Sequence, residues 1–357
     1  MRRPILGILT AGKGPVPGNR EMFRFVQQAC REAGLTAYVF TPDQVNWSRG
    51  VVRGYRYVGG RWRAGNFPLP QVVYNRVPNR QLEASAAVKQ VKRRLLTRGI
   101  PYYNARFLNK YDLYRMLTKE AAIRPHLPWT NLVRRRDDIK AALKQFGRVY
   151  LKPRHAFAGQ GIMTVELRGN DWELRYRQGN ANRVIRGSAL GELWSRLERR
   201  MGKQSYIVQQ AIPLARYRGR TFDIRLLAQK NGAGQWQVTG MGVRVASKGG
   251  ITTHVPNGGY IASAADVLPA VFGAEADRVR EKVALLAMQI APAVEKGYGG
   301  LFGEMSMDIG LDNNGHPWFF EANAKPMRFD EPGIRRKGLQ TMTAYVRYLA
   351  REAGERG

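Results

Sequence analysis

The sequence has 357 residues, 44% hydrophobic and 24% charged, so it is long enough for two or three domains with apolar cores and is not typical of a disordered chain. Lysines and arginines (59) outnumber acidic residues (27), which gives a formal net charge of +32. The most apolar stretch, 284–294, is broken by Gln289 and Pro292 and is shorter than the roughly 18 residues of a spanning helix, so we expect no membrane span.

Cysteine and histidine content indicates the compartment. The single cysteine, Cys30, cannot form an internal disulfide, and the four histidines lack zinc-binding spacing. Residues 5–9 form a short apolar run after a basic start, with no small-residue cleavage pattern, and are interpreted as a first strand. We therefore expect a cytoplasmic protein without structural zinc.

The positive charge makes an anionic partner plausible on physical grounds, because polyanions release counterions on binding cations. The sequence contains no zinc-finger spacing, basic zipper or RNA-recognition pattern, and its arginine clusters are short. Specific nucleic-acid binding is therefore not favoured. An arginine-rich codon bias, or an anionic substrate or surface, explains the charge equally well.

Hydrophobic periodicity divides the chain into an α/β region, 1–104, and an α+β region that follows it. In the first region we expect strands at 5–10, 35–40 and 72–75, helices at 22–33 and 81–98, and a hairpin turning at Gly59 and Gly60. In the second we expect helices at 112–120, 137–146, 189–201, 274–295 and 338–351, and strands at 149–151, 162–166, 206–209, 222–229, 236–245, 301–309 and 318–323.

Two oxygen-bearing side chains, Glu321 and Asn323, end an apolar strand and point to the same side of it, because they are two residues apart. Glu304, Ser306 and Asp308 have the same spacing on the preceding strand. Oxygen donors of this kind suit magnesium. The alternative is that these residues only cap strand ends or face solvent.

A lysine and a glycine-containing loop, from Lys152 through Gly159, Gln160 and Gly161, lie between two expected strands. Small residues allow backbone N–H groups to approach phosphate oxygens, and the lysine adds a point charge. The spacing is neither that of a Walker A loop nor that of a Rossmann fingerprint. A simple hairpin turn is the alternative interpretation.

Two arginines, Arg225 and Arg244, occupy otherwise apolar strands, where a guanidinium requires an anionic partner. This partner is either a phosphate or carboxylate of a ligand, or an internal carboxylate such as Asp223. Two further candidates are a cation at a helix start, Lys110, and a strand end whose backbone could meet a nucleobase, formed by Gln209, Gln210, Ala211 and Ile212.

Taken in order, these residues resemble the ATP-grasp fold. The amino-acid sequence at residues 150–153, 223–225 and 318–326 is similar to that of the endospore-coat-associated YheC/YheD-type family. The resemblance covers nearly the whole chain. It implies an α/β (pre-ATP-grasp) domain at 1–104, an ATP-grasp subdomain with the glycine loop at 105–205, and a second subdomain with the metal and arginine site at 206–357.

The resemblance also implies roles for the residues. ATP lies between the two subdomains, with Lys110 and Lys152 at its phosphates. The loop containing Gly159, Gln160 and Gly161 covers the phosphates, and Gln209, Gln210, Ala211 and Ile212 form the hinge against adenine. Asp308, Glu321 and Asn323 hold one or two Mg²⁺ ions, and Arg225 and Arg244 clamp the acylphosphate formed when a carboxylate is activated for attack by an amine.

The sequence departs from the ATP-grasp pattern at two places. The hinge has Gln209 and Gln210 where many relatives have an acidic residue for the ribose, and either His254 or Asn257 stands near the position of a common asparagine. We expect an ATP- and Mg²⁺-dependent carboxylate–amine ligase of unidentified substrates, cytoplasmic or associated with the spore coat, with coat proteins or anionic polymers as candidate partners. The alternatives are an ATP-binding coat protein without turnover and a basic polyanion-binding protein.

Overall fold

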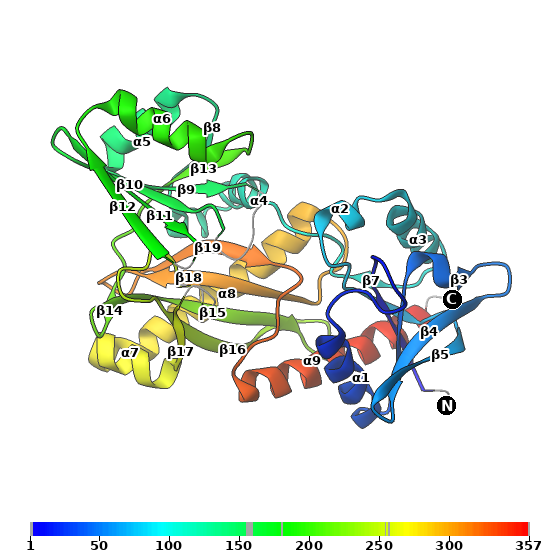
Figure 1. The fold of residues 1–357 in the computed structure, drawn as a ribbon. Coiled ribbons are helices and arrows are strands. Elements are labelled where there is room, and N and C mark those ends of the chain that lie inside the picture. The colour runs from blue at the N-terminus through cyan, green and yellow to red at the C-terminus, as the bar shows by residue number, and fades with distance from the viewer. Residues whose placement is uncertain (1–2, 155–159, 180, 254, 256–257, 356–357) are drawn as a thin grey trace.

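The computed structural model describes residues 3–154, 160–179, 181–253, 255 and 258–355. Gly159, His254 and Asn257 therefore lie outside the described residues. The described residues form three sheets with helices packed on them (Figure 1). Within the described ranges, no helix combines the length and the apolar character that crossing a membrane requires.

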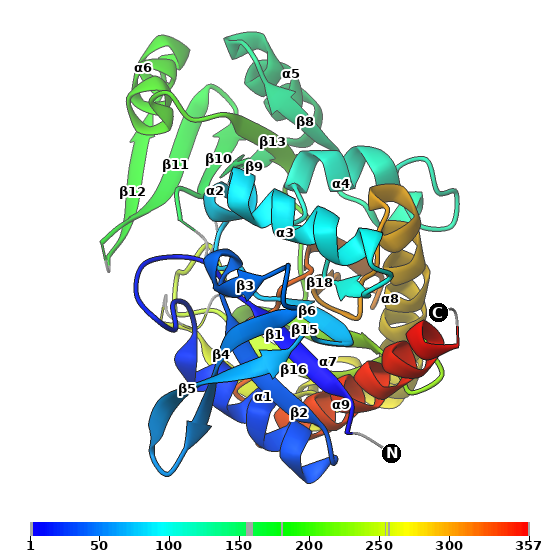
Figure 2. The same ribbon diagram turned by 90° about the vertical axis from the view of Figure 1, so that its right-hand side faces the viewer.

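The N-terminal domain is built on a sheet of order β3-β4-β2-β1-β6-β7, with β5 added to β4. Its parallel centre, β1 with β2 and β6, is the arrangement expected for an α/β domain. Helices α1 and α9 cover one face and α3 covers the other (Figure 2). The elements are β1 (Ile5–Leu9), α1 (Arg20–Glu32), β2 (Thr36–Phe40), β3 (Val45–Asn46), β4 (Val51–Val58), β5 (Arg61–Pro68), β6 (Val72–Asn75), α2 (Arg80–Glu83), α3 (Ala86–Thr97) and β7 (Tyr102–Tyr103).

The middle part of the chain forms an antiparallel sheet of order β12-β11-β10-β9-β13-β8. Helices α5 and α6 bury their apolar sides against one face of this sheet. The elements are α4 (Lys110–Leu117), β8 (Thr130–Val133), α5 (Arg136–Phe146), β9 (Arg148–Pro153), β10 (Met163–Arg168), β11 (Asp171–Gln178), β12 (Ala181–Gly187), α6 (Leu190–Met201) and β13 (Tyr206–Gln210).

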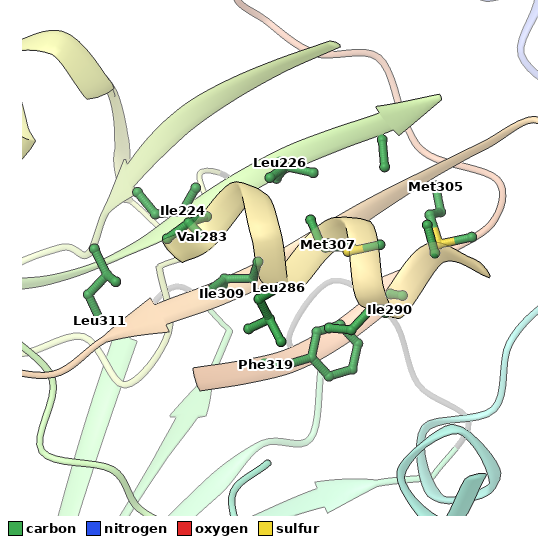
Figure 3. Packing of buried hydrophobic residues seen from close by; sticks show 14 of the residues in the cluster. Ile224, Leu226, Val283, Leu286, Ile290, Met305, Met307, Ile309, Leu311 and Phe319 are labelled. Atoms are coloured by element: carbon green, nitrogen blue, oxygen red, sulfur yellow. The ribbon is translucent and has the colours of Figure 1, made fainter. Parts of the chain in front are cut away.

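The third sheet, of order β17-β16-β15-β18-β19 with β14 beside β15, is also antiparallel. Figure 3 shows α8 seated on it, with Leu286 and Ile290 packed against the side chains of β15, β18 and β19. The elements are β14 (Arg216–Tyr217), β15 (Arg220–Lys230), β16 (Trp236–Val245), β17 (Tyr260–Ser263), α7 (Ala264–Phe272), α8 (Ala276–Tyr298), β18 (Glu304–Leu311), β19 (Pro317–Asn323) and α9 (Pro332–Gly354).

The last helix, α9, joins two parts of the molecule. Its first turns contact β15 and β16 of the third sheet. Its later residues, including Tyr345, Val346 and Leu349, are buried in the same core as β1 and α1 of the N-terminal domain. The N-terminal sheet therefore completes its core with residues from the opposite end of the chain.

Several local details differ from the sequence-based expectations, among them short strands such as β8 and β17 that were not expected. The single helix expected at 81–98 is two helices, α2 and α3, because Asn79 and Ser85 each cap a separate start. The hairpin formed by β11 and β12 and the helix α7 were not predicted. The expected hairpin at Gly59 and Gly60 is confirmed, and it joins β4 to β5.

Candidate functional site

A cleft of about 1970 Å³ is lined by the second and third sheets and by the segment of the N-terminal domain that follows β6. Among the described residues that line it, thirteen are lysine or arginine and four are aspartate or glutamate. Its walls are therefore strongly cationic, which suits an anionic ligand. The predicted site residues that line the cleft are Lys110, Lys152, Gln160, Gln209, Gln210, Ala211, Ile212, Arg225, Arg244, Asp308, Glu321 and Asn323.

Lys152 enters the cleft because of the alternation along β9. Val149, Leu151 and Pro153 are buried, whereas the intervening side chains, including Lys152, face the cleft. Its Nζ donates to Gln209 Oε1 at 2.5 Å and lies 5.4 Å from the centre of the Phe320 ring. Burial, together with the positive charge of nearby Lys110, lowers the pKa of Lys152 to about 8.

Lys110 is the first residue of α4, where the Asn109 side chain caps the helix by accepting from the N–H groups of Tyr111 and Asp112. Its Nζ forms an ion pair with Glu321 Oε2 at 2.5 Å. A cation predicted to bind phosphate is therefore paired, in this structure, with a carboxylate predicted to bind the metal.

Arg244 forms the most buried ion pair of the cleft, with its side chain 6% exposed. It donates from Nε and Nη2 to the two carboxylate oxygens of Asp223, at 2.9 and 2.6 Å, and from Nη2 to Asp308 Oδ2 at 2.8 Å. Burial opposes the charge of Arg244, but the Asp223 and Asp308 carboxylates raise its pKa. The internal ion pair, one of the two possibilities for these arginines, is thus realised at Arg244.

Asp308 is half-buried, with its side chain 21% exposed, and its pKa is lowered. Burial alone would raise the pKa of Asp308, but the Arg244 guanidinium, with Arg225 beyond it, lowers it. Asp308 is therefore ionised at neutral pH in this environment. The residue opposite it on β15 is Arg225, and the residue opposite it on β19 is Glu321.

The oxygen donors predicted to bind metal are adjacent in the sheet. Asp308 pairs with Glu321, and Ser306 pairs with Asn323, in the register of β18 and β19. Over the described ranges, no three His, Cys, Asp or Glu side chains are clustered as a metal site. Two carboxylates and one amide nevertheless form a donor set of the kind that Mg²⁺ accepts when phosphate oxygens and water complete its shell. The donor chemistry therefore fits magnesium bound together with a nucleotide.

Arg225 is held less firmly than Arg244. Its Nη2 donates to the carbonyl oxygen of Met327 at 3.5 Å, and its guanidinium carbon lies 5.0 Å from the centre of the Phe329 ring. Its Nε is buried and has no hydrogen-bond partner. A buried, unsatisfied donor on a charged group is costly, and an anionic ligand can satisfy it.

The segment with the glycine loop joins the antiparallel neighbours β9 and β10, as in a hairpin, and a role of this loop at phosphates stays a prediction. Gly161, at its far end, has φ +70°, and a Cβ there would lie 2.7 Å from Pro153 Cγ. Its carbonyl oxygen accepts from the Tyr206 hydroxyl at 3.0 Å. Gly161 does not line the cleft. Its backbone conformation sets the point at which the chain turns toward β10.

The predicted hinge consists of the last two residues of β13, Gln209 and Gln210, and the two residues that follow the strand, Ala211 and Ile212. The N–H of Gln210 donates to the carbonyl oxygen of Trp129, and the N–H of Ala211 donates to that of Arg148. The Gln209 amide is oriented by Thr130, whose Oγ1 accepts from Gln209 Nε2 at 2.9 Å. These bonds hold the segment rigidly at the wall of the cleft.

One residue that shares the spacing of Asp308, Glu304, lies elsewhere. It accepts hydrogen bonds from Tyr74, Asn104 and Gln229 beneath α9. The reason is that α9 covers the half of the sheet face nearest Glu304. Glu304 therefore belongs to the contact between the N-terminal domain and the third sheet, and not to the cleft.

Several cleft residues were not predicted from the sequence. Thr253 donates from Oγ1 to Asp223 Oδ2 at 2.6 Å, and Tyr150 shares the cleft face of β9 with Lys152. The period-two pattern of β9 contained the signal for Tyr150. Arg76 and Arg80 follow β6, at the carboxyl end of a parallel strand, which is a common position for ligand-binding residues.

The fold and the cleft define an ATP-grasp protein. The sequence profile of the family described as YheC/D like ATP-grasp matches residues 99–350, and the chain belongs to this family. It is 30% identical to the endospore coat-associated protein YheD of Bacillus subtilis (strain 168), over 98% of this chain and 80% of that protein. It is 23% identical to YheC of the same organism, over 82% of this chain and 80% of that protein.

Solved structures show the same fold at low sequence identity. D-cycloserine synthetase DcsG is 16% identical with a TM-score of 0.55, over 98% of this chain and 99% of that chain. The D-alanine-D-alanine ligase from Coxiella burnetii is 12% identical with a TM-score of 0.55, over 100% of this chain and 96% of that chain. The expected fold class, ATP-grasp with a preceding α/β domain, is confirmed.

Proposed function

We propose that the protein is an ATP- and Mg²⁺-dependent carboxylate–amine ligase. The observation that carries the proposal is the placement of cations beside oxygen donors in one cleft: Lys110 contacts Glu321, and Arg244 contacts Asp308. ATP-grasp enzymes generally use ATP and Mg²⁺, and the solved structures named above are of a synthetase and a ligase.

In the reaction we propose, a carboxylate oxygen bonds to the γ-phosphorus of ATP, the bond from that phosphorus to the β–γ bridging oxygen breaks, and ADP leaves. The amine nitrogen then bonds to the acyl carbon, phosphate leaves, and the nitrogen loses a proton. This chemistry requires positioning and neutralisation of charge, and no protein nucleophile.

The residues of the chain divide these tasks. Lys110 and Lys152 bind the phosphates of ATP, and the segment from Gln209 to Ile212 contacts its nucleobase. Arg225, with its unsatisfied Nε, is placed to contact the acylphosphate. Arg244 acts as a positioning residue, because its ion pair with Asp308 holds that carboxylate in place.

Asp308, Glu321 and Asn323 are the residues that would hold magnesium, which neutralises phosphate charge when bound. Glu321 is paired with Lys110 in this structure, so on binding of nucleotide and metal this pair would separate: Lys110 would contact phosphate and Glu321 would be one of the residues that hold the metal. The exchange keeps each charge compensated before and after binding.

The proposal is tested by thermal unfolding of the protein with ATP, with and without Mg²⁺. Ligand at a hundredfold excess over its Kd stabilises the folded state by about 2.7 kcal/mol. We expect this stabilisation with Mg²⁺ in the wild type and in Lys144→Ala, an exposed lysine on α5 that serves as a charge-matched control, but not in Lys152→Ala. Stabilisation that survives in Lys152→Ala contradicts the assignment.

A second candidate function, ATP binding without turnover in coat assembly, is favoured by the names of the relatives, which associate them with the endospore coat. Measured release of ADP and phosphate in the presence of candidate carboxylates and amines separates the two functions. A polyanion-binding protein, by contrast, shows affinity that falls steeply with salt and does not depend on Lys152.

A further inference from the structure

A group of four cations lines the cleft beyond the proposed metal residues, toward the N-terminal domain. This basic cluster consists of Arg76, Arg80, Arg225 and Lys325. Arg76 and Arg80 follow β6, Arg225 is on β15, and Lys325 follows β19. The proposed function uses only Arg225 among them.

Contacts to one short segment bring three members together. Arg76 Nη2 donates to the carbonyl oxygen of Pro326 at 3.1 Å, and Arg225 Nη2 donates to that of the next residue, Met327. Lys325 directly precedes these two residues, and its Nζ donates to the carbonyl oxygen of Val77 at 3.3 Å. Residues 325–327 therefore hold cations from the N-terminal domain and from β15 at one place.

The fourth member is connected through an aromatic ring. The guanidinium carbon of Arg80 lies 5.3 Å from the centre of the Phe107 ring, and Lys325 Nζ lies 4.2 Å from it. Arg80 also donates to the carbonyl oxygen of Leu108, two residues before Lys110. The cluster therefore adjoins the start of α4, where we propose that Lys110 binds the phosphates.

The charge of the cluster is only partly compensated within the protein. Lys325 pairs with Glu83 at 2.5 Å, and Arg76 lies 3.6 Å from Glu304. For Arg225, no carboxylate lies within ion-pair distance in the part of the chain that the structure describes, and its buried Nε has no hydrogen-bond partner. Cations held on a cleft wall with an unsatisfied donor favour an anionic ligand, and the guanidinium fork matches carboxylates.

We propose that the basic cluster binds a substrate that carries a second carboxylate close to the one that is activated, so that the carboxylate substrate is an acidic molecule with at least two such groups. The proposal rests on the proposed function, because the reacting carboxylate must lie next to Asp308 and Asn323. Arg76 and Arg225 contact the segment that directly follows β19, the strand that ends at Asn323, so the second carboxylate would lie from the metal residues toward this segment and Arg76.

The test is binding of a labelled short oligoglutamate peptide to the full chain, measured by fluorescence anisotropy at fixed moderate salt, with oligoglutamine as competitor. The variant is Arg80→Gln, which lies outside the proposed nucleotide site. Arg199→Gln, an exposed arginine on α6 that does not line the cleft, is the control with the same change in net charge. Mg²⁺ and ATP stabilisation, measured on each variant, shows that the cleft is folded.

We expect Arg80→Gln to weaken oligoglutamate binding about tenfold, the size of one charge-assisted hydrogen bond. Arg199→Gln should bind as the wild type does, and oligoglutamine should not compete. Equal weakening in both variants, competition by oligoglutamine, or no binding of oligoglutamate overturns the proposal. Competition by glutarate but not by pentanoate identifies free dicarboxylates as sufficient ligands, whereas binding of the peptide alone identifies acidic side chains on a chain; both outcomes support the proposal.

The two proposals fail separately. If oligoglutamate binding depends on Arg80 while ATP with Mg²⁺ gives no stabilisation, the proposed ligase function is wrong, and the basic cluster is a site for neighbouring carboxylates that does not serve a ligase. If ATP with Mg²⁺ stabilises the protein through Lys152 and oligoglutamate does not bind, the cluster proposal alone is wrong.

Discussion

Lys152 should make the affinity for ATP depend on pH in a specific direction. Burial and the charge of Lys110 lower its pKa from 10.5 to about 8 in the cleft without nucleotide. A bound triphosphate favours the protonated form and raises this pKa again. Affinity should therefore be greatest below pH 8 and should fall as pH rises through that value, because the free protein then loses the proton that the complex retains.

The expected magnitude follows from linkage. If phosphate restores the pKa of Lys152 to 10.5, the difference from about 8 corresponds to about 3 kcal/mol when fully expressed. Between about pH 7.5 and pH 9.5, only part of this range is crossed, and the Kd for ATP should rise about twentyfold. Isothermal titration calorimetry in the presence of Mg²⁺ at fixed ionic strength measures this change.

Lys152→Arg is the control, because arginine stays protonated over the whole range. Its profile should be flat between these pH values, so the difference between the two proteins isolates Lys152 from other titrating groups. A wild-type Kd that does not change with pH, or an equal rise in Lys152→Arg, refutes the reasoning. The stability of the free protein should change in the opposite sense, rising with pH from about 8 toward 10.5, because the unfolded chain binds the proton more tightly than the buried lysine does.

Three further predictions concern stability, measured as the free energy of unfolding in urea. Arg244→Met leaves the buried Asp223 and the half-buried Asp308 carboxylates without their partner and should cost about 3–5 kcal/mol; a loss below about 1 kcal/mol contradicts the buried ion pair. Gly161→Ala should cost about 1–3 kcal/mol, more than Gly169→Ala, which has the same sign of φ but open space around it; equal losses would show that the close approach at Gly161 is unimportant. Leu286→Ala should cost about 2–5 kcal/mol, whereas its neighbour Leu285, 62% exposed, should tolerate alanine within about 0.5 kcal/mol, and similar losses at both would mean that the register of α8 is wrong.

The order of motifs along the chain was sufficient to predict the fold and twelve of the residues that line the cleft. Lys152 could be found because β9 alternates strictly, and Asp308 with Glu321 because both strands have clear apolar patterns. Glu304 has the same spacing as Asp308, and its different location depends on which half of the sheet α9 covers. Helix packing of this kind is not encoded in the local pattern of the strand.

The missed elements have local explanations. In β11, the core residues Trp172, Leu174 and Tyr176 alternate with charged ones, so the signal was present but contained no continuous apolar run. Helix α7 contains Pro269, a residue that argues against a helix interior. The basic cluster could not be predicted at all, because its members come from three segments that meet only in the folded protein.

Residues near the C-terminal end of α9 lie in the core of the N-terminal domain, and this affects how the chain folds during synthesis. The ribosome makes β1 and α1 long before Tyr345, Val346 and Leu349, which complete their core. Until then, α1 alone covers this apolar face of the first sheet, and the part that α9 will cover is exposed. The N-terminal domain should therefore complete its folding only after α9 is made. A nascent chain that stalls before α9 should expose an apolar surface of the kind that chaperones recognise.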